Sequence, residues 1–305
     1  MTRRHFITVA DWRADELREA LDLALHLKRE HRAGISHQDV LQGKTLAMIF
    51  QKPSLRTRVS FEVGMTHLGG HALYLGPEDI KLGKRETTED IALNLSRYVD
   101  GIMARVFGHD TVEELARYAT VPVINGLSDL HHPCQALGDM LTIREKRGAL
   151  RGTTLVFIGD GNNVAHSLIE ASTRLGLRFR IACPAGQEPD AEIVAAARAV
   201  GGTVEIVHDP KEAARGADVL YTDVWTSMGQ ESEVGDRRKT FQAFTVDVDL
   251  VETANPECLV MHCLPAHYGE EISYEASRLP NSVLFDQAEN RLHAQKAVLA
   301  LLLRT

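Results

Sequence analysis

Short apolar runs alternate with longer amphipathic segments along nearly the whole chain. The run 45–50, TLAMIF, has the length and apolar character of a buried strand. Residues 10–30, by contrast, carry Leu17, Leu21 and Leu25 at the spacing of one helix face. Because parallel strands need helical crossovers between them, this alternation predicts an α/β fold built on parallel sheets.

The alternation occurs twice. The segment CQALGDMLTIREKRG is predicted to be a helix that ends at Gly148, and TTLVFIGD then starts a second series of strands and helices. A chain of 305 residues has the length of about two domains. We therefore expect domains at residues 1–147 and 148–286, each a parallel sheet flanked by helices. An amphipathic helix is expected at 289–303, within a final segment 287–305.

The composition narrows the classes of function. A formal net charge of -8 argues against a general nucleic-acid-binding surface, so an anionic ligand must be met by local cations. The four cysteines form no CxxC pair, which favours a reducing cytoplasm over a disulfide framework or a zinc site. The sequence shows no signal peptide, and its apolar runs are too short to span a membrane.

The stretch QKPSLRTR, residues 51–58, follows the predicted strand TLAMIF and precedes a predicted helix. Ligands of open α/β sheets gather at the carboxyl ends of strands, and helix N-termini bind anions through unpaired N–H groups. Ser54 and Thr57 add hydroxyl donors, and Arg56 and Arg58 add forked donors suited to phosphate. The residue types leave two readings open, an anion site or a Ser54 helix cap beside solvated arginines.

The stretch FIGDGNN, residues 157–163, places a Gly-x-Gly turn after a predicted strand. A dinucleotide site would need a third glycine where Val164 stands, and an acidic residue where the next strand ends in Cys183 and Pro184. The sequence therefore argues against a nucleotide cofactor here. Asn162 and Asn163 are instead suited to holding a polar small molecule.

Two further strand ends carry polar side chains. HHPCQ contains His132, which can polarise a carbonyl or transfer a proton, and Gln135, whose amide offers donors and an acceptor. DVWTSMG contains Asp223, which can hold an amine, and Ser227 and Met228, which could bind an amino-acid head group. A helix or loop cap is the alternative role for each of these motifs.

The remaining stretches are HCLPAH and the segment from Trp225 to Phe244. Pro265 forces irregular backbone after Cys263, which leaves carbonyl groups free to accept hydrogen bonds. The two histidines and the cysteine of HCLPAH are too few for a transition-metal site, so no metal is expected. Residues 225–244 show no periodicity and are expected to form an irregular loop, functional or simply solvated.

Together, SLRTR, HPCQ, DVWTSMG and HCLP resemble the motifs of the aspartate/ornithine transcarbamylase family, and the SMG and HCLP pieces resemble its ornithine branch. The resemblance covers essentially the whole chain. It implies two α/β domains with the active site in the cleft between them, and a C-terminal helix that returns to the first domain. It further implies carbamoyl transfer to ornithine, giving citrulline, without metal or organic cofactor, in a homotrimer or an assembly of trimers.

The resemblance also implies roles for individual residues. The side chains or backbone groups that would bind carbamoyl phosphate are those of Ser54, Leu55, Arg56, Thr57, Arg105, His132, Gln135, Cys263, Leu264 and Arg291. Those that would bind ornithine are Asn163, Asp223, Ser227 and Met228. The residues implied in catalysis are Arg56, Arg105, His132, Asp223 and Cys263.

Two positions depart from the family pattern. The family loop most often reads STRTR, whereas Leu55 stands here at the second position and can contribute only its backbone. KLGKRET aligns with a loop that reaches a neighbouring subunit's phosphate, usually through a glutamine, and Lys81 takes that position here as a point charge.

Three alternative functions differ in class. A sister transcarbamylase would use acetylornithine, succinylornithine or putrescine as the acceptor amine. A nicotinamide-dependent dehydrogenase would need the incomplete FIGDGNN turn to bind a dinucleotide. A non-catalytic binding relative would have no need of SLRTR, HPCQ and HCLP together.

Overall fold

The computed structural model describes residues 4–80, 82, 86–226 and 234–304. The chain forms two compact units. Unit 1 comprises Met1–Leu141 with Glu289–Thr305, and unit 2 comprises Thr142–Ala288. Each unit contains one parallel sheet with helices on its faces, so the predicted fold class is confirmed for the two units taken separately.

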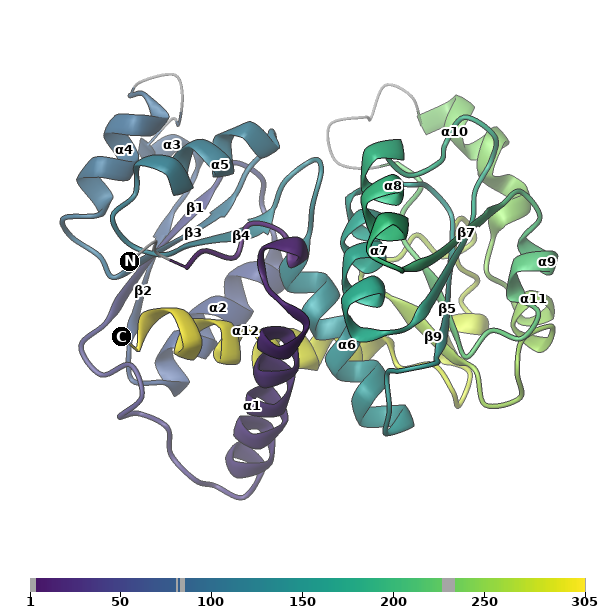
Figure 1. The fold of residues 1–305 in the computed structure, drawn as a ribbon, viewed down its shortest axis with the longest axis horizontal. Coiled ribbons are helices and arrows are strands. Elements are labelled where there is room, and N and C mark those ends of the chain that lie inside the picture. Colours follow the sequence, from purple (N-terminus) through teal and green to yellow (C-terminus); the bar gives the residue numbers. More distant parts are fainter. Residues whose placement is uncertain (1–3, 81, 83–85, 227–233, 305) are drawn as a thin grey trace. The chain divides into compact units, whose positions relative to one another are not determined.

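The sheet of unit 1 has the strand order β2-β1-β3-β4, and all its neighbouring strands are parallel (Figure 1). Its central strands are buried on both faces, which explains their continuous apolar sequences. The four strands are β1 (Thr45–Phe50), β2 (His71–Leu75), β3 (Gly101–Arg105) and β4 (Val123–Leu127).

Helices cover both faces of this sheet. In Figure 1, α4 and α5 lie over one face, and α1, α2 and α12 lie over the other. The short helices α3 and α4 were not predicted, because neither is long enough to show a clear period. The helices are α1 (Ala14–Arg32), α2 (Leu55–His67), α3 (Pro77–Ile80), α4 (Thr88–Leu95), α5 (His109–Tyr118), α6 (Pro133–Arg147) and α12 (Leu284–Leu303).

The sheet of unit 2 has the order β7-β6-β5-β8-β9 and is also parallel throughout. Apolar side chains of one face pack with the helices that follow β7 and β8 in a buried core cluster. The strands are β5 (Thr154–Ile158), β6 (Arg178–Ala182), β7 (Thr203–Val207), β8 (Val219–Thr222) and β9 (Leu259–His262).

One helix of unit 2 lies where the sequence was expected to form an irregular loop. The segment expected as an irregular loop contains α10 and a short 3-10 helix, Gln242–Phe244. Phe241 is fully buried and stacks on Trp225, so aromatic packing rather than periodicity fixes this helix. The helices are α7 (Asn163–Leu175), α8 (Ala191–Ala199), α9 (Pro210–Ala214), α10 (Val234–Phe241) and α11 (Val248–Glu252).

The last helix is longer than predicted. It begins at Leu284 rather than at Glu289, because Leu284 is buried in the apolar core of unit 2.

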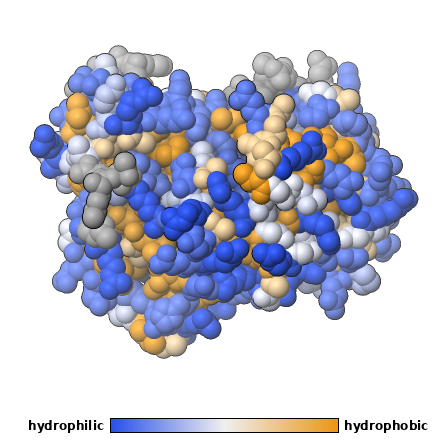
Figure 2. All heavy atoms as spheres, viewed as in Figure 1, coloured by the Kyte–Doolittle hydropathy of each residue, from blue (hydrophilic) through white to orange (hydrophobic). Residues whose placement is uncertain are grey.

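Polar residues cover most of the face drawn in Figure 2. In the part of the chain that the structure describes, no helix combines the length and the apolar content needed to cross a bilayer. All four cysteines are buried free thiols.

The strand orders locate the places where ligands are expected. In unit 1 the order reverses between β1 and β3, and in unit 2 it reverses between β5 and β8. Loops that leave two adjacent strand ends in opposite directions open a crevice there, where α/β proteins bind ligands. Ligand-binding side chains are therefore expected in the loops after β1, β3, β5 and β8.

Candidate active site

The loop after β1 leads directly into α2, and Ser54 is the N-cap of this helix. The Thr57 N–H donates to Ser54 Oγ at 3.3 Å, and the Ser54 hydroxyl donates to Thr57 Oγ1 at 3.1 Å. The predicted cap is therefore confirmed. Leu55 is 74% exposed, whereas Arg56 is half-buried. Arg58 is exposed and donates to the Glu62 carboxylate on its own helix, which removes it from the candidate site.

Arg105 is the last residue of β3, beside the loop that follows β1. The Gln51 N–H donates to the Arg105 carbonyl at 2.8 Å, and the Gln51 side chain accepts from the Phe107 N–H at 2.9 Å. The register between β3 and β4 shifts at Ala104 and Arg105, where the ladder ends. These contacts bind the two loops of the unit 1 switch point together, and Arg105 is almost fully buried there.

Arg291, on α12, lies in a chain of buried hydrogen bonds within unit 1. Its Nη1 donates to Gln135 Oε1 at 2.6 Å, and its Nη2 donates to Thr57 Oγ1 at 3.3 Å. Gln135 Nε2 in turn donates to Asp139 Oδ1 at 2.8 Å on α6. The sequence had proposed Thr57, Gln135 and Arg291 as ligand-binding residues, and the structure brings all three together.

Asp139 and Gln295 support this chain, and the sequence analysis missed both. In the amide orientation that satisfies its neighbours, the Gln295 oxygen accepts from Arg291 Nη2 at 2.9 Å and from Nε at 3.2 Å. Gln295 follows Arg291 by one helical turn, as Asp139 follows Gln135, so the spacing was a visible signal. Gly138 also belongs here, since a Cβ at this position would lie 3.2 Å from Arg291 Cδ.

His132 precedes α6 and is buried. Its pKa is well below the ordinary value, first because burial disfavours the imidazolium and then because of the positive charges of Arg291, Arg105 and Arg56. The ring is therefore neutral at neutral pH. The three guanidiniums lie within electrostatic range of one ring, and we call Arg56, Arg105 and Arg291 the arginine group.

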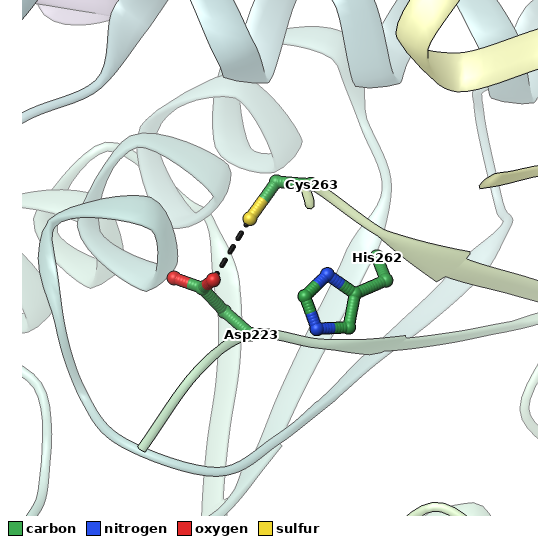
Figure 3. A group of neighbouring side chains, drawn as sticks. All are labelled: Asp223, His262 and Cys263. Atoms are coloured by element: carbon green, nitrogen blue, oxygen red, sulfur yellow. Dashed lines mark hydrogen bonds between the residues drawn. The ribbon is translucent and has the colours of Figure 1, made fainter. Parts of the chain in front are cut away.

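In unit 2, Asp223 and Cys263 follow adjacent strands, β8 and β9. The Cys263 thiol donates to Asp223 Oδ1 at 2.9 Å, and Figure 3 shows the sulfur directed at the carboxylate. Asn162 Nδ2 donates to the other carboxylate oxygen at 3.0 Å. Asp223 therefore holds a fixed orientation at the end of β8, as residues at a switch point commonly do.

The loop after β5 is shaped by backbone packing. A Cβ on Gly161 would lie 2.2 Å from the Pro189 nitrogen, so only glycine fits where these two loops meet. Asn162 is the N-cap of α7 and accepts from the Val164 and Ala165 N–H groups. The Gly-x-Gly pattern thus has a packing cause, and Asn163 begins the helix as a half-buried residue.

Arg237 and Asp160 form an ion pair at this end of the sheet, which sequence periodicity could not indicate. Arg237 Nη2 donates to Asp160 Oδ2 at 2.6 Å, and its Nε donates to the Trp225 carbonyl at 2.6 Å. Burial raises the pKa of Asp160 to about 6, although Arg237 opposes the shift. Arg237 thereby fixes α10 beside the loops that carry Asp223 and Asn162.

The backbone after β9 is held by His262 and Glu271, both fully buried. His262 Nε2 lies 2.9 Å from Glu271 Oε1, and the Leu264 N–H donates to His262 Nδ1 at 2.8 Å. Because Nδ1 accepts, the proton lies on Nε2 and points at the carboxylate. The two residues therefore fix the backbone at Leu264, and sequence reasoning did not identify this role.

Among the residues that the structure describes, two groups of side chains have the proximity expected of metal ligands. Ligand atoms of Asp223, His262 and Cys263 lie within 4.8 Å of one another (Figure 3). Both ring nitrogens of His262 already have partners, so a metal would have to displace the Leu264 N–H. The second group is the surface set His267, Glu270 and Glu271.

Three of the expected ligand-binding residues, Lys81, Ser227 and Met228, lie outside the described residues.

Models of one protein family match both units. The model described as aspartate/ornithine carbamoyltransferase, carbamoyl-P binding domain, matches residues 4–145. The model described as aspartate/ornithine carbamoyltransferase, Asp/Orn binding domain, matches residues 151–302.

Similar proteins are known over the full length of the chain. A Pyrococcus furiosus protein named ornithine carbamoyltransferase, anabolic, is 56% identical over 304 residues, which are 98% of this chain and 96% of that protein. A Methanosarcina mazei ornithine carbamoyltransferase is 52% identical over 99% of this chain and 100% of its own length.

Solved structures of similar proteins have the same fold over nearly the full chain. The structure of ornithine carbamoyltransferase from Pyrococcus furiosus superposes with a TM-score of 0.95, at 56% identity, over 98% of this chain and 97% of that one. The Thermus thermophilus structure gives 0.90 at 49% identity, over 99% and 100% of the two chains.

Proposed function

The chain belongs to the aspartate/ornithine carbamoyltransferase family, and we propose that it transfers the carbamoyl group of carbamoyl phosphate to the δ-amine of L-ornithine. The products are L-citrulline and phosphate, in a step of arginine biosynthesis. We assign residues 1–147 to carbamoyl phosphate, 148–286 to ornithine, and 287–305 to a helix that completes the first domain. The working form is a cytoplasmic homotrimer or an assembly of trimers.

The observation that carries this proposal is the arginine group around a neutral His132. The three guanidiniums of this group lie within electrostatic range of one buried ring in an acidic chain, and Arg105 ends β3 at the switch point of unit 1. This arrangement is suited to a multiply charged anion. The phosphate of carbamoyl phosphate is the anion proposed. The N-terminus of α2 supports it, because the backbone at Leu55 and the hydroxyls of Ser54 and Thr57 offer donors there.

His132 and Gln135 act on the carbamoyl group. The neutral imidazole of His132 donates a hydrogen bond to the carbonyl oxygen without adding a further positive charge beside the arginines. In the proposal, Arg105 contacts both that oxygen and the phosphate. Gln135 is held by Arg291 and Asp139, so its amide is oriented before substrate binds. The backbone carbonyls at Cys263 and Leu264 accept the carbamoyl amide hydrogens in this proposal.

Ornithine is held by the unit 2 residues. Its δ-amine is like that of lysine, with an ordinary pKa of about 10.4, so attack requires the site to favour the neutral amine. Asp223 and Cys263 orient this amine in the proposal, and desolvation together with positive charge in the site lowers the pKa of the amine. Asn163, Ser227 and Met228 bind the amino-acid end, and Lys81 approaches the phosphate of a neighbouring subunit's site.

In the reaction, the neutral δ-nitrogen attacks the carbamoyl carbon and forms a C–N bond. The C–O bond to phosphate breaks, and the proton lost by the amine passes to the departing phosphate. The arginine group stabilises charge on the carbonyl oxygen and the leaving phosphate as it develops.

The test is a citrulline assay on matched arginine variants. Arg56→Ala removes a member of the arginine group, and we expect kcat/KM to fall by about 10²–10³-fold, as when one preorganised donor is lost. Arg58→Ala is the control, because Arg58 lies two residues away but pairs with Glu62 on the surface. Normal turnover of carbamoyl phosphate by Arg56→Ala would overturn the assignment.

A second assay decides the acceptor. Ornithine, acetylornithine, succinylornithine and putrescine are compared at equal concentration with carbamoyl phosphate. We expect ornithine to react fastest, because putrescine lacks the α-carboxylate and the acylated amines lack the α-ammonium group. Faster carbamoylation of any of the other three would replace ornithine in the proposal.

A further inference from the structure

Unit 2 contains a cavity of about 250 Å³ at the amino-terminal ends of β5, β6 and β7. These strands end at the opposite edge of the sheet, where the Asn162 loop begins. A strand of five residues spans about 17 Å, so the cavity lies roughly that far from the candidate active site. The residues that shape its chemistry are Thr154, Arg178, Arg180, Thr203, Glu205 and Arg215.

The strand register explains why polar side chains meet here. Thr154 lies opposite Arg178, and Arg178 lies opposite Thr203, so the three first residues of the strands form one row. Two residues further along, Arg180 lies opposite Glu205 and points to the same face as Arg178. The row is therefore a polar edge on one sheet face.

The same face becomes apolar toward the other strand ends. Val156, Ile158 and Ala182 pack there with Ala213 and Ala214 of α9 in the core of unit 2. Helix α9 is only five residues long. Because so short a helix covers only part of the face, Arg178 and Thr203 at the starts of β6 and β7 remain exposed, whereas Thr154 is buried beneath them.

Arg180 has a structural role in this cavity. Its Nε donates to Glu205 Oε2 at 2.6 Å, and its Nη1 donates to the carbonyls of Ala213 and Arg215 at 2.8 and 3.1 Å. These bonds satisfy the end of α9 and neutralise the one carboxylate of the lining. Arg180 therefore forms the floor of the cavity rather than a free anion receptor.

Arg178 and Arg215 supply charge that no carboxylate neutralises among the described residues. Arg178 Nε and Nη2 both donate to the Thr154 hydroxyl oxygen, at 3.1 and 2.9 Å, which fixes the guanidinium plane and leaves Nη1 available. The Arg215 side chain makes no hydrogen bond or ion pair within the described ranges, and it is exposed. Two forked donors thus border one small space in a chain of net charge -8.

We propose that this cavity binds a small oxyanion with at least two negative charges, such as inorganic phosphate or a short dicarboxylate. Guanidinium groups bind both by paired, charge-assisted hydrogen bonds. A volume of about 250 Å³ is below the range of common ligand pockets, which excludes a nucleotide and fits a small anion. The hydroxyls of Thr154 and Thr203 complete the set of donors.

The test measures phosphate binding to the full chain by isothermal titration calorimetry. Phosphate is also a product of the proposed reaction, so the wild type should show two classes of site per chain. The double variant Arg178→Ala/Arg215→Ala should weaken phosphate binding at the cavity by about tenfold or more and leave the class of site at the arginine group intact. Arg56→Ala should affect only the other class, which separates this proposal from the proposed function.

Lys211→Ala is the matched control, since Lys211 lies on α9 but does not line the cavity. Thermal unfolding without phosphate should show that the double variant and Lys211→Ala remain folded, because Arg178, Arg215 and Lys211 are exposed and lie outside the apolar core. Malonate should displace phosphate from the cavity. Whichever of the two anions binds the cavity with the lower Kd is the preferred ligand. A double variant that binds phosphate with the same classes of site and the same affinities as the wild type would overturn the proposal.

Discussion

Replacement of Gly138 by alanine should reduce activity without reducing stability. Gly138 lies in α6, and a Cβ there would lie 3.2 Å from Arg291 Cδ, closer than the 3.5–4.0 Å or so at which carbon atoms pack well. Arg291 is the residue that must give way. Its guanidinium donates to Gln135 and Thr57, so a shift of its stem moves a member of the arginine group.

The size of the effect follows from these contacts. Alanine is favoured over glycine in a helix interior by about 1 kcal/mol, which offsets the cost of moving the Arg291 side chain. A shift of a few tenths of an ångström weakens charge-assisted hydrogen bonds that contribute about 1.5–3 kcal/mol each. A loss of about 1.4 kcal/mol in the transition state corresponds to about tenfold in kcat/KM.

Initial rates of citrulline formation at varied carbamoyl phosphate concentration give the kinetic result, and urea unfolding gives the stability. Gly64→Ala is the matched control, because its Cβ would meet Lys296 Cγ on α12 at an ordinary 3.5 Å. We expect Gly64→Ala to keep parental kinetics and to be more stable by up to about 1 kcal/mol. The reasoning fails if Gly138→Ala keeps its parental kcat/KM, or if both variants lose activity equally.

Three further predictions concern other parts of the two units. The pKa of His132 is depressed in the folded protein, so its contribution to stability is complete above pH 6.5 and is lost as the pH falls through the folded pKa. The difference in unfolding free energy between wild type and His132→Gln, measured in urea, should therefore shrink below pH 6.5. A difference that stays constant with pH would contradict this. Gly161→Ala should destabilise the protein by about 2 kcal/mol or more, because the new Cβ meets the backbone at Pro189; an unchanged melting temperature would refute the packing argument. Cys263→Ala removes the thiol donor to Asp223 and should lower kcat more than it raises the KM for carbamoyl phosphate, which steady-state kinetics with both substrates varied would check.

The sequence predicted the architecture well because its signals are local. Strand-length apolar runs, the restart after Gly148 and the cap at Ser54 each depend on a few neighbouring residues. The helix within residues 225–244 was missed because Phe241 and Trp225 fix it by tertiary packing. The same limit applies to the start of the last helix at Leu284.

The candidate site was predictable where it follows strand ends, and less so where helices support it. Arg105 is the last residue of β3 and Asp223 follows β8 directly, so each lies at the carboxyl edge of its own parallel sheet, where ligands are expected. The spacing of one helical turn indicates that Asp139 can pair with Gln135, but only the packing of α6 with α12 shows that this pair holds Arg291. The pairing of Arg237 with Asp160 joins residues far apart in the sequence, so no local pattern contains it.

Unit 1 is assembled from two separated stretches of the chain, and the second begins at Glu289. A ribosome therefore makes all of unit 2 before it makes Arg291. Because domains generally fold as units during synthesis, unit 2 can form its sheet while unit 1 still lacks its last helix. The nascent chain has an incomplete arginine group until Arg291 has been made, so the ability to hold the phosphate should appear only after that point of translation.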